Sequence, residues 1–517
     1  MPPSRFLALI LLAAPGLAWA EDAPTVPRLN PDQAREDVQL AIDVVEAALP
    51  DIHWRQSAAD WDAAKARALA QAARVEDPMQ LYAVVAPLMS GIGEGHLAVY
   101  PSRAAVQRES RTASVLPLDL HWSTEGVFVR AAYGEAADIP PGSELLDIDG
   151  EGYEPLLAEL MAMTPHDGDI RTGPMRDAAG GRYAVLRQRL RGDEPTFDLR
   201  YQTPDGRVVR RTVAAFPLAD HPDEPDPERT VATLEWLEPG LAYLRVPTFS
   251  NRVYREAHAD FRDTMRRLFE ELRRGRAERL ILDLRENGGG SEPNEAVLFS
   301  YLVAQPMRRY AAVEARAQDL EVASRSGQVF AHRVFDEDEM NFQRRLPDGR
   351  LTRLNVPPEG LMSHWAPSDP VFEGRLAVLA GGYTFSGGAE LASMLRHARR
   401  GVFVGEEVGG AHEGNTSGYQ WEVALPNSGV RLLVPLLQFR FDWPGLPRNR
   451  GVQPDCDVPP LVGEIGERRD RAWRVARAVV KQDWRRPEDA VCPAVAFAEK
   501  PAAGRNAAML SSQGGRA

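Results

Sequence analysis

The sequence predicts a multidomain α/β protein. Its 517 residues are too many for one ordinary domain, and about three domains of roughly 150 residues each are expected. Helical patterns occupy the N-terminal part, short strands follow, and strands alternate with helices from about residue 230 onward. Such alternation predicts a layered α/β structure with largely parallel strands in the last and largest segment.

Residues 1–20 have the pattern of an export signal. Arg5 precedes the apolar run Phe6–Leu12, and small residues around Trp19 suit cleavage after Ala20. The run is too short for a convincing membrane span, and no other stretch approaches the necessary length. We therefore expect an exported protein, periplasmic or extracellular, whose mature chain has no membrane span.

Residues 21–110 are expected to form a small helical domain. Asn30 is a suitable cap and is followed by a proline that fits the first helical turn. Further helices are expected to start at Ser57 and at Asp77. The last of these ends in a glycine-rich segment around His96, where a strand begins.

Residues 111–218 are predicted to be rich in short strands. The segment Pro140–Gly150 and the helical pattern Leu156–Met163 resemble the central strand and helix of a PDZ domain. The carboxylate-binding loop of ordinary PDZ domains is not evident, so peptide binding and a structural or lid role both remain open. The expected strands are Leu116–Trp122, Val127–Ala131, Glu144–Ile148, Thr196–Tyr201 and Val208–Val213.

Residues 219–229 form a run of prolines and acids that cannot build a core and that we interpret as a linker. The α/β domain then spans 230–485, and 486–517 are expected to be a disordered tail. The segment Met307–Pro370 could be a lid, a docking surface or an insertion. Within the domain we expect strands at Leu241–Val246, Arg279–Leu284 and Gly401–Gly405, helices at Arg255–Arg273 and Asn294–Val303, and a hairpin of Tyr419–Leu425 with Val430–Leu437.

The charge and the cysteine content exclude several functions. A formal net charge of -13, with arginines interspersed among acids, disfavours nucleic acid and acidic membranes as partners. Cys456 and Cys492 are too few for a zinc knuckle. They could pair in an oxidising compartment or stay as two buried thiols, and both alternatives remain open.

The strongest functional signal is Ser386. An apolar strand, Arg375–Ala380, breaks at glycines and leads to this serine at the start of a helix. The helix N-terminus offers free N–H groups and a partial positive charge beside the hydroxyl. An anionic tetrahedral intermediate would be stabilised there, so the pattern predicts a nucleophile.

A second signal is the triple glycine Gly288–Gly290 at the end of the strand Arg279–Leu284. Glycines let the backbone approach a ligand and expose N–H groups, as an oxyanion hole or a phosphate cradle requires. The sequence of a phosphate loop and the spacing of a dinucleotide fingerprint are both absent. A structural tight turn is the alternative.

Five segments in order resemble the motif series of the S41 serine peptidases, the tail-specific or C-terminal processing proteases. The closest branch is similar to the interphotoreceptor retinoid-binding protein group. The resemblance implies an α/β core of the ClpP/crotonase type, an acyl-enzyme on Ser386, and no metal or organic cofactor. The segments are Asp283–Gly290, Thr384–Glu390, Val404–His412, Leu425–Gly429 and Gly451–Asp455.

The resemblance also implies the partners of the serine. The oxyanion hole would use the N–H groups of Gly387 and of Gly289 or its neighbour. Processing proteases of the family carry a lysine base, but Ala411 stands at that position. The other branch uses an upstream histidine in a short turn after a helix, which His96 in Glu-Gly-His matches. An imidazole suits a base that must return its proton to a leaving amine.

Two further residues are candidates for support. His412 follows the lysine-equivalent position and is the alternative base. Glu390 lies one turn along the helix of Ser386 and could replace a glutamate of the family, since Ala389 stands in that position. The residue that orients the histidine is not evident from the sequence.

These observations favour a secreted or periplasmic serine endopeptidase with an extended polypeptide as substrate. Such a substrate can be bound by adding it as a strand to a sheet edge. A non-catalytic ligand-binding protein on the same fold is the first alternative, and the alanines at two polar positions of the relatives favour it slightly. An esterase-like hydrolase with the same acyl-enzyme chemistry is the second.

Overall fold

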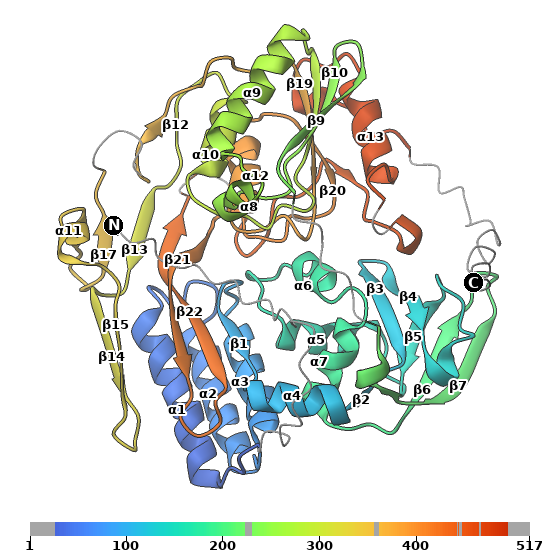
Figure 1. Ribbon diagram of the computed structural model, residues 1–517, viewed down its shortest axis with the longest axis vertical. Coiled ribbons are helices and arrows are strands. Elements are labelled where there is room, and N and C mark those ends of the chain that lie inside the picture. Colours follow the sequence, from blue (N-terminus) through green and yellow to red (C-terminus); the bar gives the residue numbers. More distant parts are fainter. Residues whose placement is uncertain are drawn as a thin grey trace, which may run out of the picture.

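A computed structural model describes residues 26–222, 230–355, 361–441, 443, 447–464 and 467–494 (Figure 1). The expected export signal, most of the linker and the tail beyond residue 494 lie outside these ranges. The parallel sheet occupies one half of the molecule, and the N-terminal helices and a second sheet occupy the other. The strands β21 and β22 reach from the first half into the second (Figure 1).

The predicted N-terminal helices are confirmed. Asn30, Ser57 and Asp77 each accept hydrogen bonds from backbone N–H groups of the first turn, as helix caps do. A short strand and a further helix follow. That helix was not predicted, because its sequence is mostly polar. The elements are α1 (Pro31–Ala48), α2 (Ala58–Ala72), α3 (Pro78–Ser90), β1 (Ala98–Tyr100) and α4 (Arg103–Thr112).

The middle segment forms a five-stranded antiparallel sheet in which the strands are neighbours in chain order. All five predicted strands are present within one or two residues of their expected bounds. The two short helices α6 and α7 were not predicted. The elements are β2 (Ser114–Val115), β3 (Leu118–Ser123), β4 (Gly126–Ala132), β5 (Glu144–Ile148), α5 (Tyr153–Met163), α6 (Thr172–Asp177), α7 (Arg182–Arg191), β6 (Thr196–Gln202), β7 (Val208–Ala214) and β8 (Phe216–Pro217).

The expected parallel sheet is confirmed as a six-stranded sheet of order β23-β20-β19-β11-β10-β9, in which only β9 runs antiparallel to its neighbour. Side chains alternate between its faces. Leu241 and Ile281 pack toward α13, whereas Ala242 and Leu282 belong to the core that contains α9, α10 and α12. The strands are β9 (Thr233–Glu238), β10 (Leu241–Arg245), β11 (Arg279–Asp283), β19 (Arg375–Ala380), β20 (Val402–Gly405) and β23 (Cys456–Asp457).

The helices around this sheet differ from prediction at two points, and the first is that the helix expected at Asn294–Val303 ends at Ser300. A single helix was expected over Arg255–Arg273, but the chain forms two. His258 has a left-handed φ of 53°, which interrupts a helix, and Asp260 then caps the second one. The helices are α8 (Asn251–Glu256), α9 (Phe261–Arg274), α10 (Asn294–Ser300), α12 (Gly387–His397) and α13 (Arg471–Val480).

A third sheet joins the two halves. Its order is β1-β22-β13-β17-β16, with β21 also paired to β22. The predicted hairpin, β21 (Gly414–Ala424) with β22 (Arg431–Arg440), is confirmed, and β1 pairs with β22. The segment 307–370 contributes β13 (Ala312–Ala315), β16 (Gln343–Arg345) and β17 (Leu351–Arg353), so part of it is built into this sheet. Its hairpin β14 (Asp319–Ala323) and β15 (Val329–Arg333) extends beside α1 (Figure 1).

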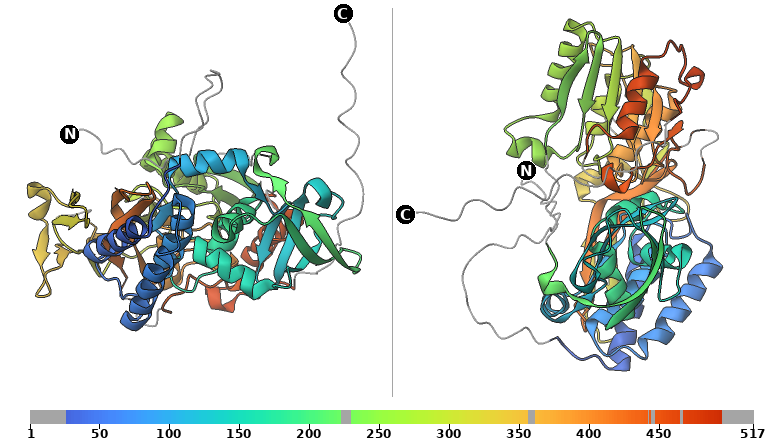
Figure 2. Two further views of the ribbon diagram at one scale, coloured as in Figure 1. Left: turned by 90° about the horizontal axis from the view of Figure 1, so that it is seen from below. Right: turned by 90° about the vertical axis from the view of Figure 1, so that its right-hand side faces the viewer.

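The first residues of the expected tail are held against the α/β core. Cys456 and Cys492 form a disulfide with their Cα atoms 5.5 Å apart, which decides between the two alternatives that the sequence left open. Residues Pro487–Asp489 form a turn of 3-10 helix. Among the described helices, none is both long and apolar enough to cross a bilayer. Figure 2 shows the two halves from the side, with β21 and β22 between them.

Candidate active site

Ser386 occupies a sharp turn between β19 and α12. It is the residue immediately before the helix, and its backbone angles are φ 50° and ψ -127°. A non-glycine residue is strained in this region, and such strain clusters at functional sites. A strained strand-to-helix turn of this kind is how α/β hydrolases present a nucleophilic serine.

The buried side chain of Thr384 holds this turn in place. Its hydroxyl donates to the carbonyl oxygen of Leu284 at 2.8 Å and accepts from the N–H of Gly381 at 3.1 Å. The N–H of Phe385 donates to the carbonyl oxygen of Asn287 at 3.0 Å. The serine turn is thereby joined to the end of β11 and to the glycine loop that follows it.

The glycine loop touches the serine directly. A Cβ atom on Gly289 would lie 2.7 Å from the Cβ of Ser386 and 2.8 Å from the backbone nitrogen of Gly387. Only glycine fits at this distance. Gly289 and Gly387, the two expected donors of the oxyanion hole, are therefore adjacent. Their N–H groups differ in whether they already donate a hydrogen bond within the protein.

The Gly289 N–H is already engaged, because it donates to the Asn287 side-chain oxygen at 2.9 Å. Gly289 can therefore serve as an oxyanion donor only if this hydrogen bond is released. The Gly387 N–H lies in the first turn of α12, where helical N–H groups lack intrahelical acceptors. Within the described part of the chain it has no acceptor.

His96 lies against the serine turn. Its imidazole stacks on the ring of Phe385, the residue before Ser386, with the ring centroids 4.6 Å apart. Its Nδ1 is buried and has no hydrogen-bond partner among the described residues. No hydrogen bond links the ring to the Ser386 hydroxyl in these ranges, and such bonds often tighten only when substrate binds. Burial lowers the pKa of His96, which keeps the ring neutral and able to accept a proton.

Asp167, which the sequence did not single out, holds the histidine turn. One carboxylate oxygen accepts from the N–H of Gly95 at 2.8 Å, and the other accepts from the N–H of Ala411 at 3.0 Å. The residue that replaces the family lysine is thus tied to the histidine turn through its backbone. The negative charge of Asp167 also raises the pKa of His96, in opposition to burial.

A buried arginine fixes the other side of this turn. Arg55 contacts Glu94 at 3.3 Å and Glu413 at 2.9 Å, and donates to the carbonyl oxygen of Gly414 at 2.8 Å. The second oxygen of Glu94 accepts from the Thr416 hydroxyl at 2.7 Å. Burial raises the pKa of Glu94 to about 7, although the charge of Arg55 opposes this. Glu94 is therefore an anchor of the turn.

Glu390 anchors the serine helix instead of orienting the histidine. Its carboxylate accepts from the Tyr310 hydroxyl at 2.5 Å and from the Asn415 side chain at 2.8 Å. Successive residues of a strand point to opposite faces. Asn415 accordingly reaches the serine helix, while its neighbour Thr416 reaches the histidine turn, so the start of β21 braces both.

The Nε2 atom of His412, the alternative base, is buried and has no hydrogen-bond partner among the described residues. Burial together with Arg396 and His397 lowers its pKa to about 4. Those two residues end α12, about 15 Å along the helix axis from Ser386 at its start. His96, by contrast, stacks on the residue next to Ser386.

One acidic cluster lies beside the serine helix. Carboxylate oxygens of Glu292, Glu295 and Glu390 all lie within 4.8 Å of one another, close enough to share a cation. Arg309 already pairs with Glu295 and lies 3.9 Å from Glu292. The Tyr310 hydroxyl donates to Glu390 and also contacts Glu292 at 3.0 Å. Protein donors thus already contact all three carboxylates, and we assign no metal to the cluster.

A largely parallel sheet with a strained serine between strand and helix, and a neutral histidine beside it, defines the class of serine hydrolases. Residues 240–458 match the family model of peptidase family S41, a span that runs from β10 to β23 and contains both Ser386 and the glycine loop. The α/β domain of this chain thus matches peptidase family S41, and the match supports a serine peptidase.

Two solved structures share the fold over most of both chains. The crystal structure of mature CPAF is 15% identical with a TM-score of 0.56, and the match covers 84% of this chain and 94% of that one. Mature CPAF complexed with lactacystin is 16% identical with a TM-score of 0.57, covering 84% and 95%. At these identities the likeness concerns the fold alone. No curated protein sequence matches the chain significantly.

Proposed function

We propose that this chain is an exported serine endopeptidase that cleaves extended polypeptides through an acyl-enzyme on Ser386, with His96 as general acid and base. The observation that carries the proposal is the strained turn at Ser386, with φ 50° and ψ -127°, together with the His96 ring stacked on the preceding Phe385. The strain presents the hydroxyl, and the stacking keeps a proton acceptor beside it.

The reaction would proceed in two halves. His96 takes the hydroxyl proton while the Ser386 oxygen bonds to the peptide carbonyl carbon, and the resulting oxyanion lies at the N-terminus of α12. His96 then gives the proton to the leaving amine as the C–N bond breaks. In the second half, water attacks the ester, His96 takes the water proton and returns it to Ser386, and the acid product leaves.

The Gly387 N–H is the primary donor to the oxyanion in this scheme, because it has no competing acceptor among the described residues. Gly289 would join it once its bond to the Asn287 side chain is released. Asp167 favours the protonated His96 that forms during attack, since its negative charge raises the pKa of that ring.

We further propose that residues 111–218 are a PDZ-like module that closes one wall of the site. The helix α6 of this module packs on the serine turn, and a Cβ atom on Gly382 would lie 2.3 Å from the carbonyl oxygen of Thr172. The buried Arg176 forms an ion pair with Glu406 at 2.9 Å. The Tyr383 hydroxyl donates to the Arg176 carbonyl oxygen at 2.5 Å. These contacts support a structural role in closing the site, with the N-terminal helical domain supplying His96.

The decisive experiment compares Ser386→Ala with Ser393→Ala on the same helix. The Ser393 hydroxyl is buried and has no partner among the described residues, so its loss is a matched control. Ser386→Ala should lower kcat/KM on an unfolded protein substrate by about 10³-fold or more, while Ser393→Ala should remain active. A Ser386→Ala variant that still hydrolyses peptides would refute the assignment.

Two measurements separate the alternatives. A fluorophosphonate probe should label wild type and fail to label Ser386→Ala, whereas a non-catalytic binding protein would not be labelled at all. Comparing rates on matched peptide and ester substrates distinguishes a peptidase from an esterase-like hydrolase.

Export is supported by the disulfide between Cys456 and Cys492, because disulfides persist in oxidising compartments. Protein recovered from the native host should have lost residues 1–20 and should show no free thiol when denatured without reductant. Free thiols in that protein, with Met1 retained, would contradict export.

A further inference from the structure

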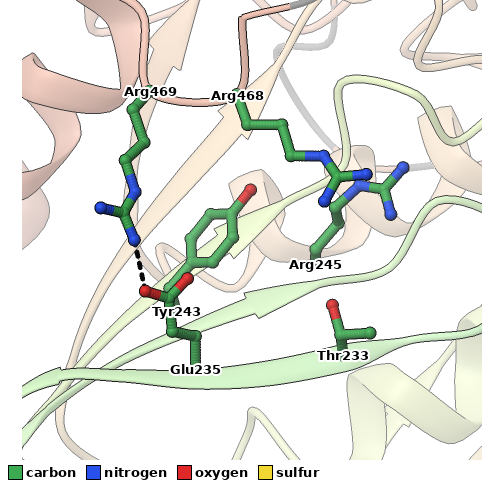
Figure 3. A pocket seen from close by; sticks show the side chains of 6 residues that line it. All are labelled: Thr233, Glu235, Tyr243, Arg245, Arg468 and Arg469. Carbon is green, nitrogen blue, oxygen red and sulfur yellow. Dashed lines mark hydrogen bonds and ion pairs between the residues drawn. The ribbon is translucent and has the colours of Figure 1, made fainter.

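A pocket of about 250 Å³ lies at the edge of the parallel sheet, on the face that carries α13 (Figure 3). Alternate residues of β9 and β10 line it, together with the two arginines just before the helix. It is smaller than the cavities that hold drug-sized molecules. The lining residues are Thr233, Glu235, Tyr243, Arg245, Arg468 and Arg469.

This pocket is separate from the serine site. Tyr243 belongs to the core formed with α13, whereas α12, which begins immediately after Ser386, packs on the opposite face of the sheet. Strand β11 also lies between β10 and β19, the strand that leads to Ser386. A ligand in this pocket would therefore not compete with a substrate at the serine.

Two of the three guanidinium groups have acidic partners. Arg469 pairs with Glu235, as the dashed line in Figure 3 marks. Arg245 is only 6% exposed, pairs with Glu286 and donates to the Thr230 hydroxyl at 2.8 Å. Arg245 is thus a buried cation that contributes to the pocket wall.

Arg468 differs from both. Its side chain has neither an ion pair nor a hydrogen bond with any residue in the ranges that the structure describes. In Figure 3 it extends across the pocket toward Arg245. Two positive groups that face each other repel, and an anion between them would turn this repulsion into attraction.

The donors present match one ligand chemistry. Guanidinium groups offer a planar fork of N–H donors that fits carboxylate and phosphate oxygens. The Tyr243 hydroxyl already donates to Asp283 at 2.7 Å, so the arginines provide the free donors. We propose that this pocket binds a small oxyanion, a phosphate or a carboxylate group, between the guanidinium groups of Arg245 and Arg468.

The test is calorimetric titration of the full chain with sodium phosphate, with sodium chloride added to keep the ionic strength constant. A second arm uses an acetylated dipeptide with a free C-terminal carboxylate and its amidated counterpart. Saturable binding in either arm supports the site and identifies which oxyanion it prefers. The absence of saturable binding in both arms overturns the proposal.

Variants locate the binding. Arg468→Ala should weaken it at least tenfold, whereas Arg474→Ala, which removes an exposed arginine outside the pocket, should leave it unchanged. Glu235→Gln should tighten binding, because it removes a carboxylate from the wall and frees Arg469. Ser386→Ala should bind as wild type does. Equal affinity of Arg468→Ala and wild type would refute the assignment.

Discussion

The substitution Asp167→Asn tests how the histidine is positioned. Asparagine has the shape of aspartate, but it retains one acceptor oxygen and places an NH₂ group against the second N–H. The carboxylate accepts from Gly95 at 2.8 Å and from Ala411 at 3.0 Å, so one charge-assisted bond is lost and one buried N–H is left unpaired. Hydrogen bonds to charged groups contribute about 1.5–3 kcal/mol, and the free energy of unfolding should fall by that amount.

The effect on catalysis has two parts. A displacement of the His96 turn by about 1 Å would lower kcat/KM by about 10²-fold. The pH dependence changes as well. Burial lowers the pKa of His96 from its ordinary value of 6.5, and the negative charge of Asp167 raises it. Without that charge the pKa falls further, so the neutral base persists to lower pH and the acidic limb of the profile shifts to lower pH.

The assay is kcat/KM on a fluorogenic peptide as a function of pH, combined with urea unfolding. Asp169→Asn is the matched control, because it makes the same change two residues away at an exposed position. If the role of Asp167 were purely structural, Asp167→Asn would lower the maximal kcat/KM but would leave the acidic limb of the pH profile at the same pH. That outcome, or a profile identical to wild type, would refute the electrostatic part of the reasoning.

Three more substitutions probe the supports of the site. Thr384→Val removes a buried hydroxyl that joins two backbone groups, and urea unfolding should show a loss of about 1–3 kcal/mol. Arg55→Met leaves buried acids without their counter-charge and should lower the free energy of unfolding by about 3–5 kcal/mol. Because the pKa of Glu94 is raised to about 7, this loss should be larger above that pH than below it, and equal losses would contradict the network. Gly388→Ala puts a Cβ atom 2.2 Å from a carbonyl oxygen of the glycine loop, so peptide hydrolysis should fall while Gly463→Ala, whose Cβ meets nothing within 4 Å, stays active.

The candidate nucleophile could be located in the sequence because its signal is local. An apolar strand, a run of glycines and a helix start within a dozen residues determine where Ser386 lies along the chain. The glycine loop after β11 could be found for the same reason. That Gly289 donates to Asn287 could not be predicted, since a backbone N–H leaves no trace in residue identity.

The supports of the histidine could not be found in this way. Asp167 and Arg55 come from segments far from His96 and Ser386 in the chain, and a lone aspartate or arginine has no distinguishing pattern. The residue types at the start of β21 likewise give no hint that Asn415 contacts the serine helix and Thr416 the histidine turn.

The sequence by itself determined the α/β class, the resemblance to peptidase family S41, the strand-to-helix turn at Ser386 and the alanine at position 411, where the processing proteases of that family carry a lysine. These properties depend on short-range periodicity and on motifs that are contiguous in the chain. Tertiary structure alone decided that His96 stacks on Phe385, the residue before Ser386, and that Cys456 meets Cys492. The physical reason is that such contacts depend on how distant segments pack, which local sequence does not encode. For His96, the pairing of the neighbouring strand β1 with β22 is one such contact between distant segments.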